Sequence, residues 1–399
     1  MAGTAADVLA RADELGAISE EPDRLVRRFG TPALARASDR VAGWMEEAGL
    51  TVRRDAVGNL IGRAAGDAPP FVLGSHLDTV PNAGRYDGPL GILVALAAVE
   101  RLSARGAAPI PLEVVAFADE EGTRFGTSYL GSAAYTGGFE REWLGLVDAD
   151  GITLGEAIAA TGENPDSAAE PPPPQLAGYL EVHIEQGPVL EREDLPVGVV
   201  SAVAGQTRPR VVVTGAAGHA GTLPMNGRRD ALAAAAEIVL AVERIGRGTD
   251  GLVATVGAME LSPNVANVVP GEARLLLDVR HAEDDARARA TDAMRAEVER
   301  IASERGVDVT WTLRYDTPAV ELSPDLRRRL EGAVEEAGHP VRTLVSGAGH
   351  DAVMLARVCP AAMLFVRCAG GISHDPREAV EEADVAVALD VVERFLRGL

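Results

Sequence analysis

The order of predicted strands and helices limits the fold of this chain more than any other feature. Short apolar runs bounded by turn residues, typical of buried strands, cover residues 71–75, 112–118 and 179–184. Helical apolar spacing covers residues 33–48 and 88–104. Strands that alternate with helices in this way favour a parallel sheet in an α/β domain.

Residues 208–315 break the alternation. They are predicted to form strand, helix, strand, strand, helix and strand, at 209–214, 227–245, 252–259, 272–280, 283–305 and 307–314. This is the complete order of a split ferredoxin-like unit. The α/β pattern then resumes with helix 324–336, strand 341–345, helix 351–357, strand 362–367 and helix 384–397. We therefore expect an α/β domain with a mixed, mainly parallel sheet, residues 1–207 and 316–399, interrupted by a ferredoxin-like α+β domain, residues 208–315.

Composition excludes several kinds of partner. The formal charge of −22 is spread along the chain and would repel phosphate backbones, so we expect neither nucleic acid nor a membrane as partner. No apolar run is long enough to span a bilayer, and residues 1–15 resemble an acidic amphipathic helix rather than a signal peptide. With only two cysteines, expected as buried thiols without a catalytic role, the chain is predicted to be cytoplasmic. The Pro-rich residues 163–178 are expected to form an exposed, extended loop.

The chain contains no lysine, so all 38 basic residues are arginine. A Walker A loop, a pyridoxal Schiff base and a lysine general base are therefore excluded. The same absence excludes a barrel in which a carboxylated lysine bridges two metals.

Four of the predicted strands end in histidine or acidic residues. These are His76, Asp78 and Asp87; Asp119, Glu120 and Glu121; His183 and Glu185; and His374. Each group alone has an ordinary explanation, such as a satisfied hydrogen-bond pair or a solvated loop. Because α/β proteins build their sites at the carboxyl ends of parallel strands, the four together predict one site. His281 and His339 are expected on the surface.

Imidazoles and carboxylates without a thiolate favour Zn²⁺ or another first-row ion over Ca²⁺ or Mg²⁺. Three histidines and two carboxylates exceed the needs of one catalytic zinc. Two ions roughly 3.5–4 Å apart that share a carboxylate would use them all. Glu120, next to the ligand Glu121, is then left as the general base.

Several motifs in order between residues 74 and 378 resemble the hydantoinase/carbamoylase branch of the M20-type dinuclear metallo-amidohydrolases. The branch includes N-carbamoyl-L-amino-acid hydrolases, β-ureidopropionase and allantoate amidohydrolase. The motifs are GSHLDTVPNAGRYDGPLG, FADEEGTRFG, HIEQGPVLE, GHAGTLPMNGRRDAL, SPNVANVVPGEARLLLDVRH, SGAGHDA and GGISHDPRE.

The resemblance assigns roles to individual residues. It implies that His76, Asp87 and His183 hold one ion, that Asp87, Glu121 and His374 hold the other, and that Asp78 orients His76. The substrate contacts that it implies are Gln186, Gln206, His219, Asn267, Arg280, Gly370 and Gly371, with His219 also stabilising an oxyanion. The role of His350 and Asp351 does not follow from it.

The resemblance also implies two divalent ions per subunit, with Zn²⁺ as first choice and Mn²⁺, Co²⁺ or Ni²⁺ as alternatives. The inserted domain would act as a lid and dimerise the chain, and the active site could be completed across subunits.

The implied activity is hydrolysis of the carbamoyl C–N bond of N-carbamoyl-L-amino acids, which releases the amino acid, CO₂ and ammonia. Allantoate amidohydrolase is the alternative, followed by a dinuclear metallopeptidase or aminoacylase and by a non-catalytic metal-binding protein. The aspartate of GRYDG, close behind the first histidine, and the histidine of HIEQ favour ureido substrates over peptides.

Two further classes are weakly supported. Gly347, Gly349 and Ala352 match a dinucleotide fingerprint, but the next strand lacks the acid that would bind a ribose. No nucleophile elbow surrounds Ser346, which disfavours a serine hydrolase.

Overall fold

The structure, a computed structural model, describes residues 3–106, 109–169 and 175–399. The chain divides into two compact units, a large one of Met1–Ser201 with Leu322–Leu399 and a small one of Ala202–Glu321. The small unit begins earlier and ends later than residues 208–315, since its first strand in the chain, Gly205–Thr214, starts before the predicted strand and its last, Asp308–Thr317, ends after it. Each unit is described by itself.

The large unit is built on a mixed sheet with the order β1-β2-β4-β3-β5-β15-β6-β13, in which β14 also pairs with β6. Its strands are β1 Thr51–Arg54, β2 Leu60–Arg63, β3 Phe71–His76, β4 Leu112–Phe117, β5 Gly178–Ile184, β6 Val197–Val203, β13 Val320–Glu321, β14 Thr343–Ser346 and β15 Ala361–Val366. The four central strands β4, β3, β5 and β15 are parallel, and antiparallel strands flank them. The predicted α/β class is confirmed.

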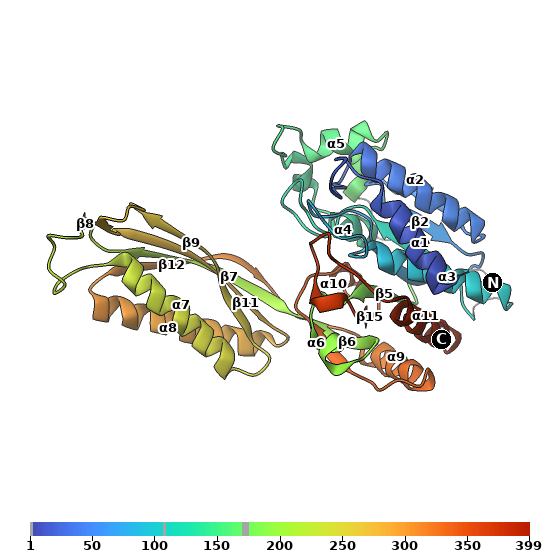
Figure 1. Cartoon of the computed structure of the whole chain (residues 1–399). Helices are drawn as coiled ribbons and strands as arrows, with labels where there is room; N and C mark the ends of the chain where they lie inside the picture. Colours follow the sequence, from blue (N-terminus) through green and yellow to red (C-terminus); the bar gives the residue numbers. More distant parts are fainter. Residues whose placement is uncertain (1–2, 107–108, 170–174) are drawn as a thin grey trace. The chain divides into compact units, whose positions relative to one another are not determined.

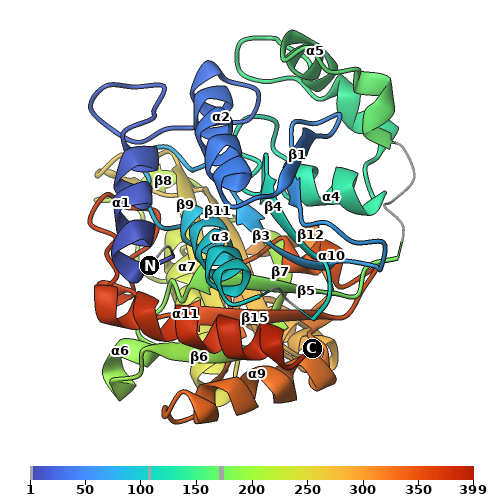
Figure 2. The same ribbon diagram turned by 90° about the vertical axis from the view of Figure 1, so that its right-hand side faces the viewer.

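Helices cover this sheet (Figure 2). They are α1 Ala5–Gly16, α2 Pro32–Glu47, α3 Pro89–Ala104, α4 Leu130–Thr136, α5 Leu154–Ala160, α6 Val189–Glu193, α9 Pro324–Glu336, α10 Ala352–Leu355 and α11 Glu382–Arg397, with short 3-10 helices η1 Arg141–Gly145, η2 Pro165–Ala169 and η3 Ala369–Gly371. Helix α3 packs on β3, β4 and β5 and is apolar around most of its circumference, as expected for a helix buried on several sides. Gly91 permits this packing, because a Cβ there would lie 2.1 Å from the Val182 carbonyl oxygen of β5.

The small unit has a four-stranded antiparallel sheet with the order β12-β7-β11-β9, and α7 and α8 lie side by side on one face (Figure 1). Its elements are β7 Gly205–Thr214, β8 Gly218–His219, α7 Ala231–Gly248, β9 Val253–Ser262, β10 Val268–Val269, β11 Glu272–His281, α8 Asp284–Arg305 and β12 Asp308–Thr317. Alternate β11 residues, among them Leu275, Leu277 and Val279, face the helices and are buried. This is the predicted ferredoxin-like order. The two-residue strands β8 and β10, which pair as a small arm, were not predicted.

Two local predictions are wrong. His281 is buried rather than on the surface, because it continues the inward-facing alternation of β11 and contacts the Asp250 carbonyl oxygen at 3.0 Å. Residues 163–178 are not a wholly extended loop, because Pro165–Ala169 forms a 3-10 helix with Ala168 buried. Residues 170–174 of that segment lie outside the described residues.

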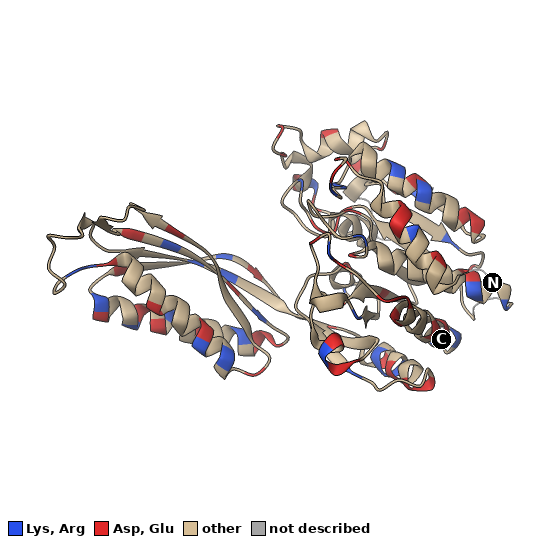
Figure 3. Cartoon of the chain, viewed as in Figure 1, with Lys and Arg blue, Asp and Glu red and all other residues tan. Residues whose placement is uncertain are grey.

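Acidic and basic residues are interspersed along the helices of both units instead of gathering by sign (Figure 3). This agrees with the even spread of charge along the sequence. None of the helices in the described ranges combines the length and apolar character needed to cross a membrane.

Candidate metal centre

The carboxyl ends of the four parallel strands bring the predicted metal ligands together. His76 is the last residue of β3, Glu121 follows β4, His183 lies near the end of β5, and His374 follows β15. Since these strands are neighbours in the order β4-β3-β5-β15, their ends meet along one edge of the sheet.

Asp87, in the loop after β3, lies between two groups of ligand atoms. Its Oδ1 is 3.2 Å from Nε2 of His183 and 3.5 Å from Nε2 of His76. Its Oδ2 is 3.3 Å from Nε2 of His374, and the same nitrogen is 3.3 Å from Oε1 of Glu121. Two groups of ligands therefore share the Asp87 carboxylate, with one oxygen turned to each group. The groups are His76, Asp87 and His183, and Asp87, Glu121 and His374.

The donor atoms fit two divalent ions. Nδ1 of His76 lies 3.1 Å from the Asp78 carbonyl oxygen, and Nδ1 of His183 lies 3.0 Å from that of Ile184. Each Nδ1–H donates to a carbonyl, which leaves the Nε2 lone pair free on the side of Asp87. Ligands at about 2.0–2.1 Å from a tetrahedral zinc are about 3.3–3.4 Å apart, which matches the distances around Asp87. The buried cluster and the chemistry of its donors indicate a dinuclear metal site.

Charge at the site also favours cations. Burial lowers the pKa of His76, but the carboxylates of Asp78 and Asp87 outweigh burial and raise this pKa well above its usual value. Burial raises the pKa of Asp87, yet hydrogen bonds with His183, His374 and His76 hold it well below the usual range. Asp87 and Glu121 raise the pKa of His374 to about 10. The carboxylates around these histidines thus favour positive charge at the position that the ligand atoms surround.

Glu120 is buried beside the ligands. Its carboxylate lies within 4.8 Å of ligand atoms of His76 and Glu121. Burial, and then the neighbouring carboxylate of Glu121, raise its pKa well above the usual value, although His76 acts in the opposite direction. A protonatable carboxylate at this position has the properties of a general base and acid.

Asp78 fixes the backbone of the acidic loop. Its carboxylate oxygens accept the N–H groups of Glu120 at 3.0 Å and Glu121 at 3.2 Å. His76 Nδ1 is closer to the Asp78 carbonyl oxygen than to the carboxylate, at 3.1 Å against 3.5 Å. Asp78 thus contacts both His76 and the acids that follow β4.

Gln186, which is predicted to bind substrate, contacts Asp87 in the structure. Its amide donates to Asp87 Oδ2 at 2.8 Å, and the Ser373 hydroxyl donates to the same oxygen. Gln186 and His374 both adopt left-handed backbone, with φ of 56° and 58°. Such a conformation costs a non-glycine residue roughly 1–2 kcal/mol and is found most often at functional sites.

Two supporting residues were missed in the sequence. Glu378 Oε1 accepts the N–H groups of Tyr86 at 2.7 Å and Asp87 at 3.0 Å, and so fixes the shared ligand. Its place in GGISHDPRE, close to His374, was the available signal. Asn59, fully buried, accepts the N–H of Ala118 at 2.9 Å and donates to the Gly131 carbonyl at 2.7 Å. It holds both ends of the loop that carries Glu120, and nothing in its sequence context indicated this.

The other predicted residues of the large unit contact the site less directly. The N–H group of Gly370 donates to Glu191 of α6 and that of Gly371 to the Cys368 carbonyl, so both N–H groups already have partners in the protein. His350 packs edge-on against His183, with ring centroids 4.5 Å apart, and its Nε2 lies 2.7 Å from Ser346 Oγ. Burial, and then His183, lower the pKa of His350 well below the usual value, so it is neutral.

The predicted contacts of the small unit form two pairs rather than one cluster. Gln206 lies opposite Arg280 across β7 and β11, and Arg280 forms a two-point ion pair with Asp278 at 2.7 and 2.9 Å. His219 and Asn267 lie together on the exposed arm, where the Ala220 N–H donates to the Asn267 carbonyl at 2.9 Å.

The two pairs lie near opposite ends of the β7–β11 ladder. The arm follows the Thr214 end of β7, where Thr214 pairs with Glu272, whereas Gln206 lies near the other end of the strand (Figure 1). At 3.2–3.4 Å per residue, the stretch from Gln206 to Thr214 spans about 26 Å. A substrate of a few atoms therefore cannot contact both pairs of one subunit.

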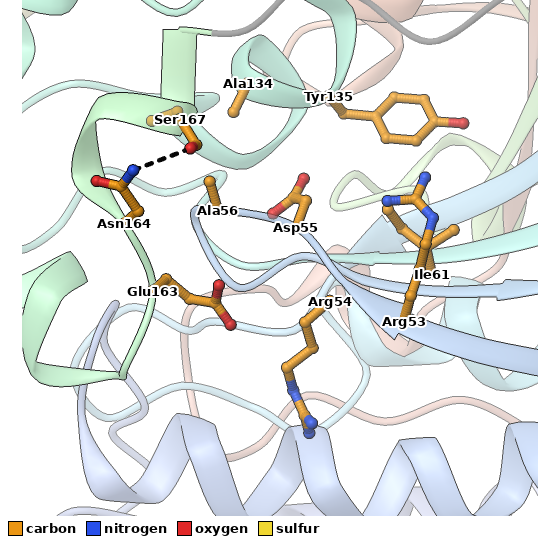
Figure 4. A pocket seen from close by; sticks show the side chains of 11 residues that line it. Arg53, Arg54, Asp55, Ala56, Ile61, Ala134, Tyr135, Glu163, Asn164 and Ser167 are labelled. Atoms are coloured by element: carbon orange, nitrogen blue, oxygen red, sulfur yellow. Dashed lines mark hydrogen bonds between the residues drawn. The ribbon is translucent and has the colours of Figure 1, made fainter.

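A separate hollow of about 370 Å³ lies over β1, α4 and η2 and contains none of the predicted site residues (Figure 4). Its polar side chains are largely engaged with protein groups: Asp55 with Asn59, Tyr135 with Glu113, and Asn164 with Ser167. We therefore place no ligand there.

A parallel sheet edge that gathers two histidine–carboxylate groups around a shared aspartate defines a dinuclear metallohydrolase. Residues 72–398 match the family described as Peptidase family M20/M25/M40, and the chain belongs to this family. This confirms the resemblance drawn from the motifs.

Similar proteins place the chain within the family. It is 41% identical to the N-carbamoyl-L-amino acid amidohydrolase of Geobacillus stearothermophilus, over 96% of this chain and 95% of that protein. It is 38% identical to an allantoate deiminase of Arabidopsis thaliana, over 98% of this chain and 82% of that protein. The crystal structure of a hydantoinase/carbamoylase family amidase from Burkholderia multivorans superposes with a TM-score of 0.93 at 36% identity. The match covers 99% of this chain and 97% of that one. The chain is a metal-dependent amidohydrolase of this group.

Proposed function

We propose that the protein hydrolyses the carbamoyl C–N bond of N-carbamoyl-L-amino acids, releasing the amino acid, CO₂ and ammonia. The observation that carries the proposal is the Asp87 carboxylate shared by two ligand groups, with Glu120 buried beside them. The name of the Geobacillus relative supports the substrate class. Allantoate is the second candidate, because a relative is named allantoate deiminase and allantoate also carries a ureido group and a carboxylate.

In the proposed mechanism the side chains of this chain handle the proton and position the substrate. When bound, two divalent cations supply Lewis-acid activation of water and of the scissile carbonyl. A carboxylate oxygen of Glu120 takes the proton of the attacking water and returns it to the leaving nitrogen. Asp78 keeps Glu120 in place through the backbone. The mixed imidazole and carboxylate donors favour Zn²⁺, with Mn²⁺, Co²⁺ or Ni²⁺ as alternatives.

Arg280 is the proposed contact for the substrate carboxylate, because a guanidinium binds a carboxylate through two parallel hydrogen bonds. Asp278 holds this guanidinium from one side. His219 and Asn267 are the proposed donors to the oxyanion.

We further propose that the protein is a homodimer whose small unit completes the partner's site. The separation of about 26 Å along β7 supports this, because Arg280 of one subunit and His219 of the partner subunit could then serve the same substrate. A cytoplasmic location also remains a prediction, which cell fractionation would test.

The direct test of the function is ammonia release from N-carbamoyl-L-amino acids, N-carbamoyl-β-alanine and allantoate, with release of free amino acids measured for dipeptides, before and after chelation and metal restoration. We expect turnover of N-carbamoyl-L-amino acids that disappears on chelation and returns with added metal. Turnover of allantoate alone would select the second candidate. Activity that survives complete metal removal, or cleavage of dipeptides only, would overturn the proposal.

A further inference from the structure

We propose that Arg228 and the backbone N–H of Gly221 together fix the tautomer and orientation of His219, so that this residue presents a neutral Nε2–H donor. Arg228 is then a positioning residue for the reaction. The inference about catalysis rests on the proposed function, in which His219 contacts the substrate, whereas the inference about the tautomer does not.

The tautomer follows from a single hydrogen bond. The Gly221 N–H donates to His219 Nδ1 at 3.1 Å. A ring nitrogen that accepts a hydrogen bond carries no proton, so the proton of the neutral ring is on Nε2. A neutral Nε2–H can donate to a developing oxyanion without itself transferring a proton. This separates the role of His219 from that of Glu120.

The turn after His219 depends on Arg228. The His219 carbonyl accepts the N–H groups of Thr222 at 3.3 Å and Leu223 at 3.0 Å, which closes a tight turn. Arg228 Nη2 donates to the carbonyls of Ala220 at 2.8 Å and Leu223 at 2.7 Å, and its Nε lies 3.2 Å from the Leu223 carbonyl oxygen and 3.3 Å from that of Pro224. One guanidinium thus ties together three carbonyl groups of the turn, those of Ala220, Leu223 and Pro224.

Packing does little to hold this turn. His219 is exposed, and Met225 at the tip is 76% exposed. Because the ring is exposed, its orientation depends mainly on the hydrogen bonds of the turn. Loss of the guanidinium should therefore free the turn and break the bond to Nδ1 without affecting the core of the small unit.

The adjacent arginine is a natural control. Arg229 donates to the Gly306 carbonyl and, at 2.7 Å, to Asp308, so its guanidinium is engaged outside the turn. Arg228→Met and Arg229→Met remove the same charge from neighbouring positions, but only the first removes the ties to the turn. Gly221→Pro and Gly221→Ala form a second pair. Both substitutions add a Cβ, which would lie 3.4 Å from Cε1 of His219, an ordinary van der Waals contact. Only proline also removes the backbone N–H.

The first test is the nitrogen NMR spectrum of the metal-loaded, full-length protein labelled in histidine, with His219→Asn to assign the resonance. We expect an unprotonated Nδ1 and a protonated Nε2 for His219 in the wild type, Arg229→Met and Gly221→Ala. We expect averaging between tautomers in Arg228→Met and Gly221→Pro. A protonated Nδ1 in the wild type, or an unchanged His219 signal in both Arg228→Met and Gly221→Pro, would overturn the proposal.

The second test is a double-mutant cycle on kcat with the best substrate of the panel. Arg228→Met should lower kcat by about tenfold or more, a fraction of the loss on removing an oxyanion donor, and Arg229→Met should stay within about twofold. In the His219→Asn background Arg228→Met should have no further effect. An equal loss in both backgrounds would show that Arg228 acts only on the general structure. If His219→Asn retained full kcat, the proposed role of His219 would fail while the tautomer result stood.

Discussion

The predicted site residues of the large and small units are held in opposite ways. Those around Asp87 are mostly buried, come from the ends of four adjacent strands and already face one another. Those of the small unit, apart from the buried Gln206, are partly or fully exposed. They lie near opposite ends of the β7–β11 ladder and depend on local partners such as Asp278 and Arg228. A sheet edge can preorganise ligands for an ion, whereas the exposed contacts depend on a few local hydrogen bonds and, as proposed, on a second subunit.

The largest effect should come from the shared ligand. Asp87→Ala removes an oxygen from both ligand groups, so we expect loss of both ions and a fall in kcat of more than about 10³-fold. Metal content per subunit and ammonia release check this, with Asp166→Ala, in the exposed ion pair with Arg141, as control. A variant that still binds two ions would show that Asp87 does not bridge.

Glu120→Gln separates catalysis from metal binding within the same buried region. Because the amide keeps the shape but cannot take a proton, kcat should fall by about 10²–10⁴-fold. The content of two ions per subunit should be unchanged. Loss of an ion would make Glu120 a ligand, and unchanged turnover would favour a non-catalytic metal-binding protein.

Mixing subunits tests the exposed region. His219→Asn and Arg280→Ala should each be impaired alone, Arg280→Ala mainly through a higher KM. After unfolding and refolding together in equal amounts, half of the dimers would be mixed, each with one intact site, which gives about a quarter of wild-type activity. No recovery, in a sample shown by tagged subunits to contain mixed dimers, would place both residues in the site of one subunit.

The smallest predicted effect is a loss of stability on substitution of Asn59, which supports the loop that carries Glu120. Asn59→Leu leaves the Ala118 N–H and the Gly131 carbonyl without their partner, and should lower the free energy of unfolding by about 1–3 kcal/mol. Urea denaturation checks this against Asn164→Ala, an exposed asparagine for which a change within about 0.5 kcal/mol is expected. Equal stability of the two variants would show that the Asn59 contacts are not stabilising.

The sequence predicted the buried centre of the fold better than its edges. Apolar runs such as 71–75 define strands because both of their faces are buried, and polar residues after them mark the sheet edge. Strand β1 was missed because its charged Arg53 and Arg54 belong to an exposed edge. The contact of Asn59 with Ala118 joins residues 59 positions apart, which no local pattern encodes. His281 was misplaced although its register with Val279 indicated an inward side chain.

Motifs also do not encode distance. GHAGT and LDVRH each suggested a substrate contact, but only the pairing of β7 with β11 shows that Arg280 lies near the end of the ladder opposite to the one from which the arm with His219 continues.

The last consequence concerns the junction where the small unit begins and ends. Val203 pairs with Val320 and Ala202 with Glu321, so the chain leaves and returns on adjacent antiparallel strands. Along the chain, the small unit therefore takes the place of the turn that would join β6 and β13 in a simple hairpin. Such an insertion can lengthen, shrink or be exchanged between relatives without altering the strand order of the large unit. Substrate range could therefore evolve by replacement of one contiguous cassette while the metal chemistry is inherited unchanged.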